Sequence, residues 1–417
     1  MNTNSPRGMK SYLPKSAFEI KIIKKNIERV FDRWGYKEIM TPLMEYYDIL
    51  KSGVGEKNKQ ELYKLIDREG NVLALKSEMT APIARTVANR ISEIKFPLRY
   101  SYFSSVYRYN QDQQGKKREI YQMGVEFIGN KKITADAEIL IMAVEAIKES
   151  GMEKFEMDIG HVKYLEGVFT EFNLDNKERE KVKSFLNKRN VVGLRKYLQQ
   201  FEKSDLLEEL LLLRGGKEIF SQVRKLTDNK LILNALENLK EVYEFLEDYG
   251  VGKYINFDLS LIRGFNYYSG IVFEAFSKSL GYLICGGGRY DNLIENFSDK
   301  KIPAVGFALG IDRIRLALKS EKIDYKEESE KQVVLFQKDN RKSALNYLRN
   351  LHYQGDKALM YMLNEDEVED IKDKSLVKEF ILKKYDEEKI TKISLFLNNK
   401  TDLPEVIELE RQEEKDE

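Results

Sequence analysis

The chain has 417 residues, of which 42% are hydrophobic and 33% are charged, and its formal net charge is +1. This balance is typical of a globular protein of two or three domains and lacks the basic excess of many nucleic-acid binders. The single cysteine, Cys285, and the two distant histidines, His161 and His352, argue against a disulfide, a zinc site and a Ser-His-Asp triad. We see no signal peptide and no apolar run long enough to span a membrane, so we expect a cytoplasmic protein without a metal or an organic cofactor.

The first predicted elements are a helix and a broken strand. Residues 16–34 repeat apolar side chains at helical spacing, and Gly35 follows as a stop signal. The segment 35–45 then reads as a short strand that Pro42 interrupts, and residues 62–76 read as two short strands joined by a turn.

Residues 99–129 follow a strand–loop–strand pattern, and the second strand carries polar side chains at alternate positions. Arg118, Gln122, Gly124 and Glu126 should share one sheet face, because side chains alternate along a strand. If that face is buried, the glycine leaves room for a ligand between an amide and a carboxylate. The alternative is a solvated face, and this segment alone favours it.

Residues 162 to about 250 change to charged, leucine-rich amphipathic stretches, which predict a helical insertion. Strand character returns at 254–276 and 281–286, and GGGRYD reads as a glycine-rich turn. We therefore expect an α+β core over 1–320. A small α/β domain should follow at 332–410, with an acidic tail at 411–417.

Two further segments carry candidate binding groups. Arg263 precedes Tyr267 and Tyr268, and an arginine beside paired tyrosines can bind a carboxylate against an aromatic wall. On its own, such a tyrosine pair is more often core. Arg313 follows a glycine-rich strand and could contact a phosphate, although such an arginine is more often a surface residue. The glycines around it form neither a P-loop nor a convincing dinucleotide fingerprint.

Taken in order, these segments resemble class II aminoacyl-tRNA synthetases of the histidyl type over residues 5 to about 320. GYKEIMTPLME is similar to motif 1, with Pro42 at the dimer-interface position, and VYRYNQDQQGKKREIYQMGVEFIG is similar to motif 2. LIRGFNYYSG resembles the histidyl signature LVRGLDYYTG, which is highly specific, and GFALGIDR resembles motif 3. The resemblance implies an antiparallel sheet flanked by helices.

The resemblance also implies roles for matching residues. Those expected to bind histidine are Glu78, Thr80, Gln122, Glu126, Arg263, Tyr267 and Tyr268. Those expected at a vestigial nucleotide site are the arginines Arg108, Arg118 and Arg313. We expect no catalytic residue.

Departures from the synthetase pattern fall mainly on the ATP side. Asn110 replaces a glutamate, Lys116 replaces an arginine, and Asn266 replaces an aspartate. Met79, in LKSEMT, resembles the LRPDMT of the regulatory subunit of ATP phosphoribosyltransferase, although Lys76 and Ser77 match neither family. The C-terminal region lacks the glycine-rich strand and the basic residues expected of a tRNA-binding domain.

These departures favour a non-catalytic regulatory subunit over a working synthetase. The resemblance implies that it assembles with itself as a homodimer and with short-form ATP phosphoribosyltransferase catalytic subunits. It would support the first step of histidine biosynthesis and relay feedback inhibition by L-histidine, without binding nucleic acid. Histidine would bind in the synthetase-like pocket or at a subunit interface. The alternatives are an active histidine–tRNA ligase with drifted motifs and a related enzyme with another amino acid or acceptor.

Overall fold

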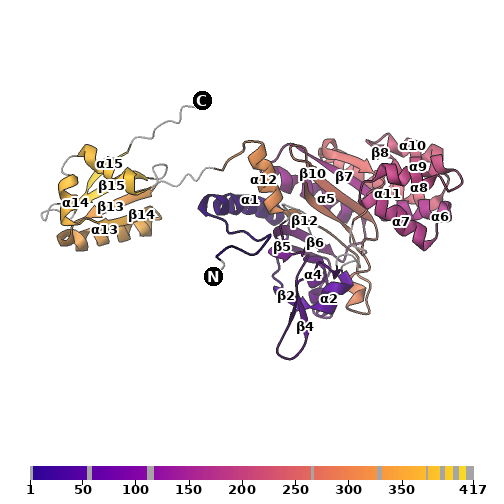
Figure 1. Cartoon of the computed structure of the whole chain (residues 1–417), viewed down its shortest axis with the longest axis horizontal. Helices are drawn as coiled ribbons and strands as arrows, with labels where there is room; N and C mark the ends of the chain where they lie inside the picture. Colours follow the sequence, from indigo (N-terminus) through magenta and orange to yellow (C-terminus); the bar gives the residue numbers. More distant parts are fainter. Residues whose placement is uncertain are drawn as a thin grey trace. The chain divides into compact units, whose positions relative to one another are not determined.

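The computed structural model describes residues 3–53, 59–109, 117–263, 267–325, 331–371, 374–385, 390–397 and 403–409. The chain divides into two compact units, Met1–Tyr325 and Lys326–Glu417 (Figure 1). The departures at Asn110, Lys116 and Asn266 lie outside the described residues, as does the acidic tail.

A nine-stranded sheet forms the centre of the first unit, in the order β1-β5-β6-β12-β11-β10-β7-β9-β8. Its strands are β1 (Lys37–Glu38), β5 (Leu98–Tyr107), β6 (Glu119–Ile128), β7 (Phe155–His161), β8 (Arg214–Gly215), β9 (Ile255–Asp258), β10 (Ile271–Ser277), β11 (Leu283–Arg289) and β12 (Ala304–Gly310). Neighbouring strands are antiparallel, except that β1 is parallel to β5 and β7 is parallel to β9. The predicted α+β class with a mainly antiparallel sheet is confirmed.

The two faces of the sheet differ in character, and β6 shows this clearly. Met123, Val125 and Phe127 are at most 1% exposed and join the main hydrophobic core. That core lies between the sheet and the helices α1 (Pro14–Arg33), α5 (Ile133–Glu149) and α12 (Ile311–Ser320) (Figure 1). The alternate residues of β6 therefore face the opposite side, where the candidate site lies.

Helix α1 forms as its apolar spacing predicted. Ile23, Ile27 and Val30 are fully buried along one stripe, and each such side chain contributes roughly 1.5–3 kcal/mol on burial. Gly35 follows with a φ of +76°, a backbone conformation that favours glycine after a helix. The Trp34 indole donates a hydrogen bond of 2.7 Å to Glu145, which ties the end of α1 to α5.

The first unit also contains a small three-stranded sheet of order β2-β4-β3. Its strands are β2 (Met44–Tyr46), β3 (Lys64–Ile66) and β4 (Val72–Leu75). Helix α2 (Tyr47–Gly53) packs against β2 and β4, and helix α4 (Thr80–Ala88) packs against α2. The β3–β4 turn is closed by Asp67, which accepts a 2.7 Å hydrogen bond from the backbone of Asn71. This is the hairpin that residues 62–76 predicted.

Residues 162–250 are mainly helical and share the main core with the sheet. The helices are α6 (Val162–Glu171), α7 (Asn176–Asn187), α8 (Val191–Leu198), α9 (Ser204–Leu212), α10 (Ile219–Leu226) and α11 (Lys230–Asp248). Buried Leu207, Leu210 and Leu211 belong to the same hydrophobic cluster as α5 and β7. The helices gather at the end of the sheet that carries β7 and β8 (Figure 1).

The segment GGGRYD does not form the expected turn, because its glycines continue strand β11. A Cβ atom on Gly286 would lie 1.7 Å from the Arg263 guanidinium, and one on Gly287 would lie 2.1 Å from the Gly306 carbonyl oxygen. These glycines serve close approach within the sheet, and a run of three glycines resembles a turn only in sequence.

The second unit is a four-stranded sheet of order β14-β13-β15-β16 with helices on both faces. It contains β13 (Lys331–Phe336), α13 (Arg341–Gln354), β14 (Lys357–Met362), α14 (Glu365–Asp370), α15 (Lys374–Lys384), β15 (Ile390–Phe396) and β16 (Glu405–Glu408). Val334 and Phe336 pack toward α13, whereas Val333 and Leu335 join the cluster on the other face. The predicted small C-terminal α/β domain is confirmed.

Candidate functional site

A pocket opens on the sheet face opposite α1 and encloses about 770 Å³ between its lining atoms, part of it open to solvent. Strands β6, β11 and β12 supply its floor, and α4 and the segment before β10 supply its walls. The predicted residues that line it are Glu78, Thr80, Arg108, Gln122, Glu126, Arg263, Tyr267, Tyr268 and Arg313. These residues are far apart in sequence, and the fold brings them to one place.

Glu126 lies at the bottom of the pocket and is 1% exposed. Its carboxylate accepts a 2.9 Å hydrogen bond from the Thr80 hydroxyl and another from the Tyr290 hydroxyl. Burial raises the pKa of Glu126 to about 8, the two hydrogen bonds oppose that rise, and the nearby charge of Glu78 adds to it. Near neutral pH this group can exchange a proton in response to a ligand.

Glu78 lies beside Glu126 and caps helix α4. Its two carboxylate oxygens accept hydrogen bonds of 2.6 and 2.9 Å from the backbone N–H groups of Thr80 and Ala81. Burial raises the pKa of Glu78 against the effect of these two bonds. Glu78 therefore combines a structural role at the helix terminus with a negative charge in the pocket wall.

The space beside Gly124 is filled by protein, which corrects the expectation that it is left for a ligand. A Cβ atom at this position would lie 2.5 Å from the Tyr102 hydroxyl and 2.1 Å from the Phe307 carbonyl oxygen. Tyr102 is the cross-strand partner of Gly124 on β5, so its ring lies over the glycine and its hydroxyl reaches the pocket.

Arg263 lies near the ring of Tyr268, and its hydrogen bonds to the protein are made by one guanidinium nitrogen. Its Nη1 donates hydrogen bonds of 3.1 Å to the Phe273 carbonyl oxygen and to the Glu274 carboxylate, while its buried Nε has no hydrogen-bond partner among the described residues. Its Cζ atom lies 5.8 Å from the ring centroid of Tyr268. The guanidinium can thus accept a further anionic partner from the pocket.

The aromatic wall consists of three tyrosines, of which Tyr267 is in ring contact with both Tyr268 and Tyr290. The ring centroids of Tyr267 and Tyr268 are 4.8 Å apart, and those of Tyr267 and Tyr290 are 5.7 Å apart. Burial raises the pKa of all three hydroxyl groups, so they stay protonated and can donate hydrogen bonds at neutral pH. This wall suits a flat polar ring.

Two of the three predicted nucleotide-side arginines line the pocket, and the third does not. The Arg108 Nε atom donates to the Ser77 carbonyl oxygen at 2.9 Å, and the Arg313 Nη1 atom donates to the Leu283 carbonyl oxygen at 2.8 Å. Arg118 is outside the lining residues. Its guanidinium instead lies 4.2 Å from the ring centroid of Tyr109.

The departure at Lys76 has a local explanation. Lys76 is 3% exposed, and its ammonium group lies 3.3 Å from both the carbonyl oxygen and the hydroxyl of Thr41. It therefore ties the segment before α4 to the motif 1 segment and is not a lining residue of the pocket.

The sequence analysis missed the lining residues Tyr102, Cys285 and Tyr290. It also missed Glu274, which does not line the pocket but holds Arg263. Tyr290 directly follows β11, and its place in GGGRYD was interpreted as part of a turn. Tyr102 comes from β5 and Cys285 from β11, and the sequence does not reveal the register in which these strands pair with their neighbours. Burial raises the pKa of the Cys285 thiol, so it stays protonated and lines the pocket as a small apolar group rather than as a nucleophile.

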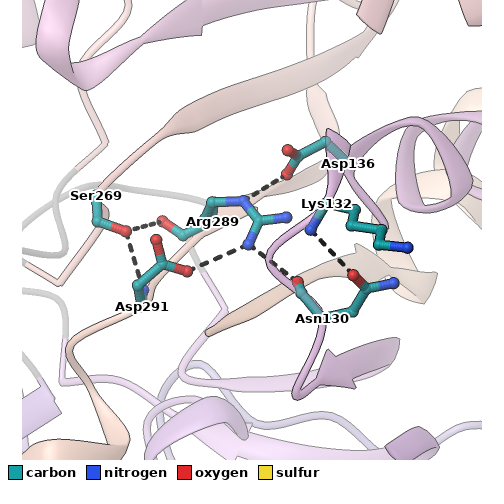
Figure 2. A network of polar contacts seen from close by, with 6 residues as sticks. All are labelled: Asn130, Lys132, Asp136, Ser269, Arg289 and Asp291. Carbon is teal, nitrogen blue, oxygen red and sulfur yellow. Dashed lines mark hydrogen bonds and ion pairs between the residues drawn. The ribbon is translucent and has the colours of Figure 1, made fainter. Parts of the chain in front are cut away.

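A buried polar network holds the pocket wall to helix α5 (Figure 2). The Arg289 Nε atom donates to Asp136 at 2.8 Å, and its Nη1 donates at 3.2 Å to both Asp291 and the Asn130 carbonyl oxygen. Ser269 accepts a 2.9 Å bond from the Asp291 backbone N–H. The network fixes the end of β11 next to the segment before β10 and so sets where Tyr290 and Tyr268 stand.

Within the ranges that the structure describes, no group of histidine, cysteine, aspartate or glutamate side chains is arranged to hold a metal ion. Over the same ranges, no helix combines the length and the apolar character needed to cross a membrane. The pocket itself offers carboxylates, guanidinium groups and phenol groups, which together suit a zwitterion with a polar ring.

Comparisons with known proteins agree with this geometry. The profile of the histidyl-tRNA synthetase family matches residues 8–314. An ATP phosphoribosyltransferase regulatory subunit from Halothermothrix orenii is 48% identical over 371 residues, which cover 88% of this chain and 89% of that protein. A histidine–tRNA ligase from Methanocaldococcus jannaschii is 38% identical over 328 residues, which cover 78% of this chain and 77% of that protein.

The chain is also similar in fold to a solved structure of a related protein. An ATP phosphoribosyltransferase regulatory subunit/histidyl-tRNA synthetase from Bacillus halodurans superposes with a TM-score of 0.81 at 31% identity. The superposition covers 95% of this chain and 99% of that one, so both units have counterparts there.

Proposed function

The chain belongs to the histidyl-tRNA synthetase family and, within it, to the regulatory subunits of ATP phosphoribosyltransferase, and we propose that its pocket is the sensor for L-histidine. In this role it assembles with a catalytic subunit in the cytoplasm, uses no cofactor and performs no chemistry of its own. Histidine is its effector and transmits feedback to the first step of histidine biosynthesis.

The observation that carries the proposal is the complementarity of the pocket to histidine. Glu126 with Tyr268 offers partners for an imidazole ring, and Glu78 with Gln122 offers acceptors for an ammonium group. Arg263 offers the cation for a carboxylate, and its buried Nε lacks a hydrogen-bond partner among the described residues. Each charged or polar end of the amino acid thus has a matching group.

The absence of ligase activity is proposed on sequence and geometry together. Asn110, Lys116 and Asn266 replace residues that the synthetase pattern uses. Arg118 is engaged by Tyr109 and is not a lining residue, which leaves fewer cations for a triphosphate. We also propose that tRNA is not a partner, since the net charge is only +1 and the C-terminal region is rich in acidic residues.

Arg108 and Arg313 favour the alternative, an active histidine–tRNA ligase, because both still line the pocket. The relative from Methanocaldococcus jannaschii is named a histidine–tRNA ligase and is 38% identical, so the alternative needs a direct test.

Histidine-dependent exchange of pyrophosphate into ATP separates the two functions. We expect calorimetry to show L-histidine binding to the full chain and the exchange assay to show no activity. Exchange at a rate typical of enzymes, with kcat of about 1–10 per second, would establish the ligase instead. Filter binding at physiological salt should show no preference for histidine tRNA over unrelated tRNA.

A further inference from the structure

Arg263, the cation assigned to the ligand carboxylate, is already paired within the protein. Its Nη1 lies 3.1 Å from a Glu274 carboxylate oxygen, and the two side chains are only 12% and 17% exposed. An ion pair in such surroundings is stronger than one at the surface, and Glu274 presents to Arg263 the same chemical group as an amino acid does. A ligand carboxylate at the unpaired Nε brings a second negative charge against Glu274, so the two carboxylates compete electrostatically for this one guanidinium.

A second arginine, Arg189 of the helical insertion, acts electrostatically on Glu274. Arg189 lies between α7 and α8, and its Cζ atom is 5.1 Å from the ring centroid of Phe276. Phe276 and Glu274 are two residues apart on β10 and so lie on the same sheet face. Within the described ranges the Arg189 guanidinium has no hydrogen bond and no ion pair within 4 Å. Burial raises the pKa of Glu274, and the charges of Arg263 and then of Arg189 lower it.

The surroundings of Glu274 make an unpaired carboxylate costly. Its cross-strand neighbour on β7 is Asp158, and the charges of Asp158 and Asp258 both raise the pKa of Glu274. Arg214 cannot serve as the new partner, because its Nη2 already donates to both oxygens of Asp158, at 2.7 and 2.9 Å. Two other cations interact electrostatically with Glu274, namely Arg313 in the pocket, whose Nη1 already donates to the Leu283 carbonyl oxygen at 2.8 Å, and Arg189 from the insertion.

We propose that Glu274 is a built-in competitor that a ligand carboxylate displaces from Arg263 toward Arg189, so that pocket occupancy is transmitted to helices α7 and α8. This inference rests on the proposed binding of histidine in the pocket. Displacement leaves Glu274 among carboxylates, and pairing with Arg189 restores its charge balance. Arg189 has a left-handed φ of 49°, so a new ion pair there stabilises a backbone conformation that is costly for arginine.

The experiment compares L-histidine with L-histidinol, which has the imidazole and the amine but no carboxylate. Hydrogen exchange is followed by mass spectrometry on the full chain, in peptides that cover 176–198. Saturating L-histidine should slow exchange in these peptides, and saturating L-histidinol should not. Two variants then test the path, Glu274→Gln and Arg189→Ala.

Glu274→Gln removes the competing charge, so it should tighten L-histidine binding about fivefold and abolish the slowed exchange in 176–198. Arg189→Ala removes the partner that Glu274 meets after displacement, so it should weaken L-histidine binding about fivefold and also abolish the slowed exchange. Arg224→Ala is the matched control, because this insertion arginine pairs with Glu237 at the surface. It should behave as the wild type.

The outcomes separate this inference from the proposed function. Failure of the wild type to bind L-histidine overturns both. Binding with unchanged exchange in 176–198, equal effects of histidinol and histidine, or protection that persists in Glu274→Gln overturns the transmission through Glu274 alone.

Discussion

The hydroxyl group of Tyr290 donates a hydrogen bond to the carboxylate of Glu126, and the two residues lie 164 positions apart in the chain. Burial keeps the pKa of Tyr290 well above its usual value, so this hydroxyl remains a donor at neutral pH. Glu126 therefore meets a ligand with one oxygen engaged by Tyr290 and the other by Thr80. Its protonation state decides whether it accepts or donates a hydrogen bond to an imidazole.

The first prediction concerns the pH dependence of stability. The pKa of Glu126 is about 8 in the folded chain and about 4.5 when unfolded, so the folded chain holds a proton that the unfolded chain releases. The stabilisation is complete below about pH 4.5 and is lost as the pH rises through about 8. Glu126→Gln, which cannot ionise, should lose less stability than the wild type between pH 5 and 8.

Urea denaturation monitored by fluorescence tests this, because Trp34 is the single tryptophan and reports on the first unit. Glu166→Gln, at an exposed position on α6, is the control and should follow the wild-type profile. Parallel pH profiles for wild type and Glu126→Gln would contradict the raised pKa.

The second prediction concerns the network around Arg289. Asp136→Ala leaves a guanidinium that is 9% exposed without its closest anion, which should cost about 3–5 kcal/mol of unfolding free energy. Asp291→Ala should cost less, about 1 kcal/mol, since that side chain is 28% exposed. Both values follow from urea denaturation monitored by Trp34. Equal losses in the two variants would argue against Asp136 as the main partner.

The sequence predicted those parts of the site that depend on local periodicity. The helical spacing of Ile23, Ile27 and Val30 and the alternation of Gln122 and Glu126 both depend only on near neighbours in the chain. They were therefore visible without a structure.

The parts that could not be predicted depend on strand register and close approach. Tyr102 fills the space beside Gly124 because β5 and β6 pair in that register. Alternation would place Arg118 with Gln122, but β6 begins at Glu119, and the Arg118 guanidinium stacks on Tyr109 instead. Neither contact leaves a local signal in the sequence.

The third prediction is a homodimer formed through the motif 1 region. Met40, Leu43, Met44 and Tyr46 are 82%, 48%, 42% and 58% exposed, an apolar group that is costly to leave in water. Light scattering should give twice the 48.8 kDa chain mass at micromolar concentration. Met40→Asp should shift the chain toward the monomer, because a two-fold interface repeats the introduced charge on both sides.

Val192→Asp is the matched control for the dimer, since Val192 is 80% exposed on helix α8. It should leave the mass unchanged. A wild-type monomer, or a Met40→Asp variant with the wild-type mass, would place the interface elsewhere or remove it.

The last prediction is that L-histidine stabilises the chain through Glu126. Ligand at about 100 times its dissociation constant should add about 2.7 kcal/mol to the unfolding free energy, which a melting curve detects easily. Glu126→Ala should abolish the shift because it removes the hydrogen-bond partner of the imidazole, whereas Glu166→Ala on the surface of α6 should retain it.

The same pair of variants, assembled with the catalytic subunit, shows where the effector acts. We expect histidine to inhibit the wild-type and Glu166→Ala assemblies and to lose potency against Glu126→Ala. Equal inhibition of all three would place the effector site at a subunit interface. That result would leave the family membership intact, since it rests on 48% identity over 88% of the chain, and would remove Glu126 and its neighbours from the effector site.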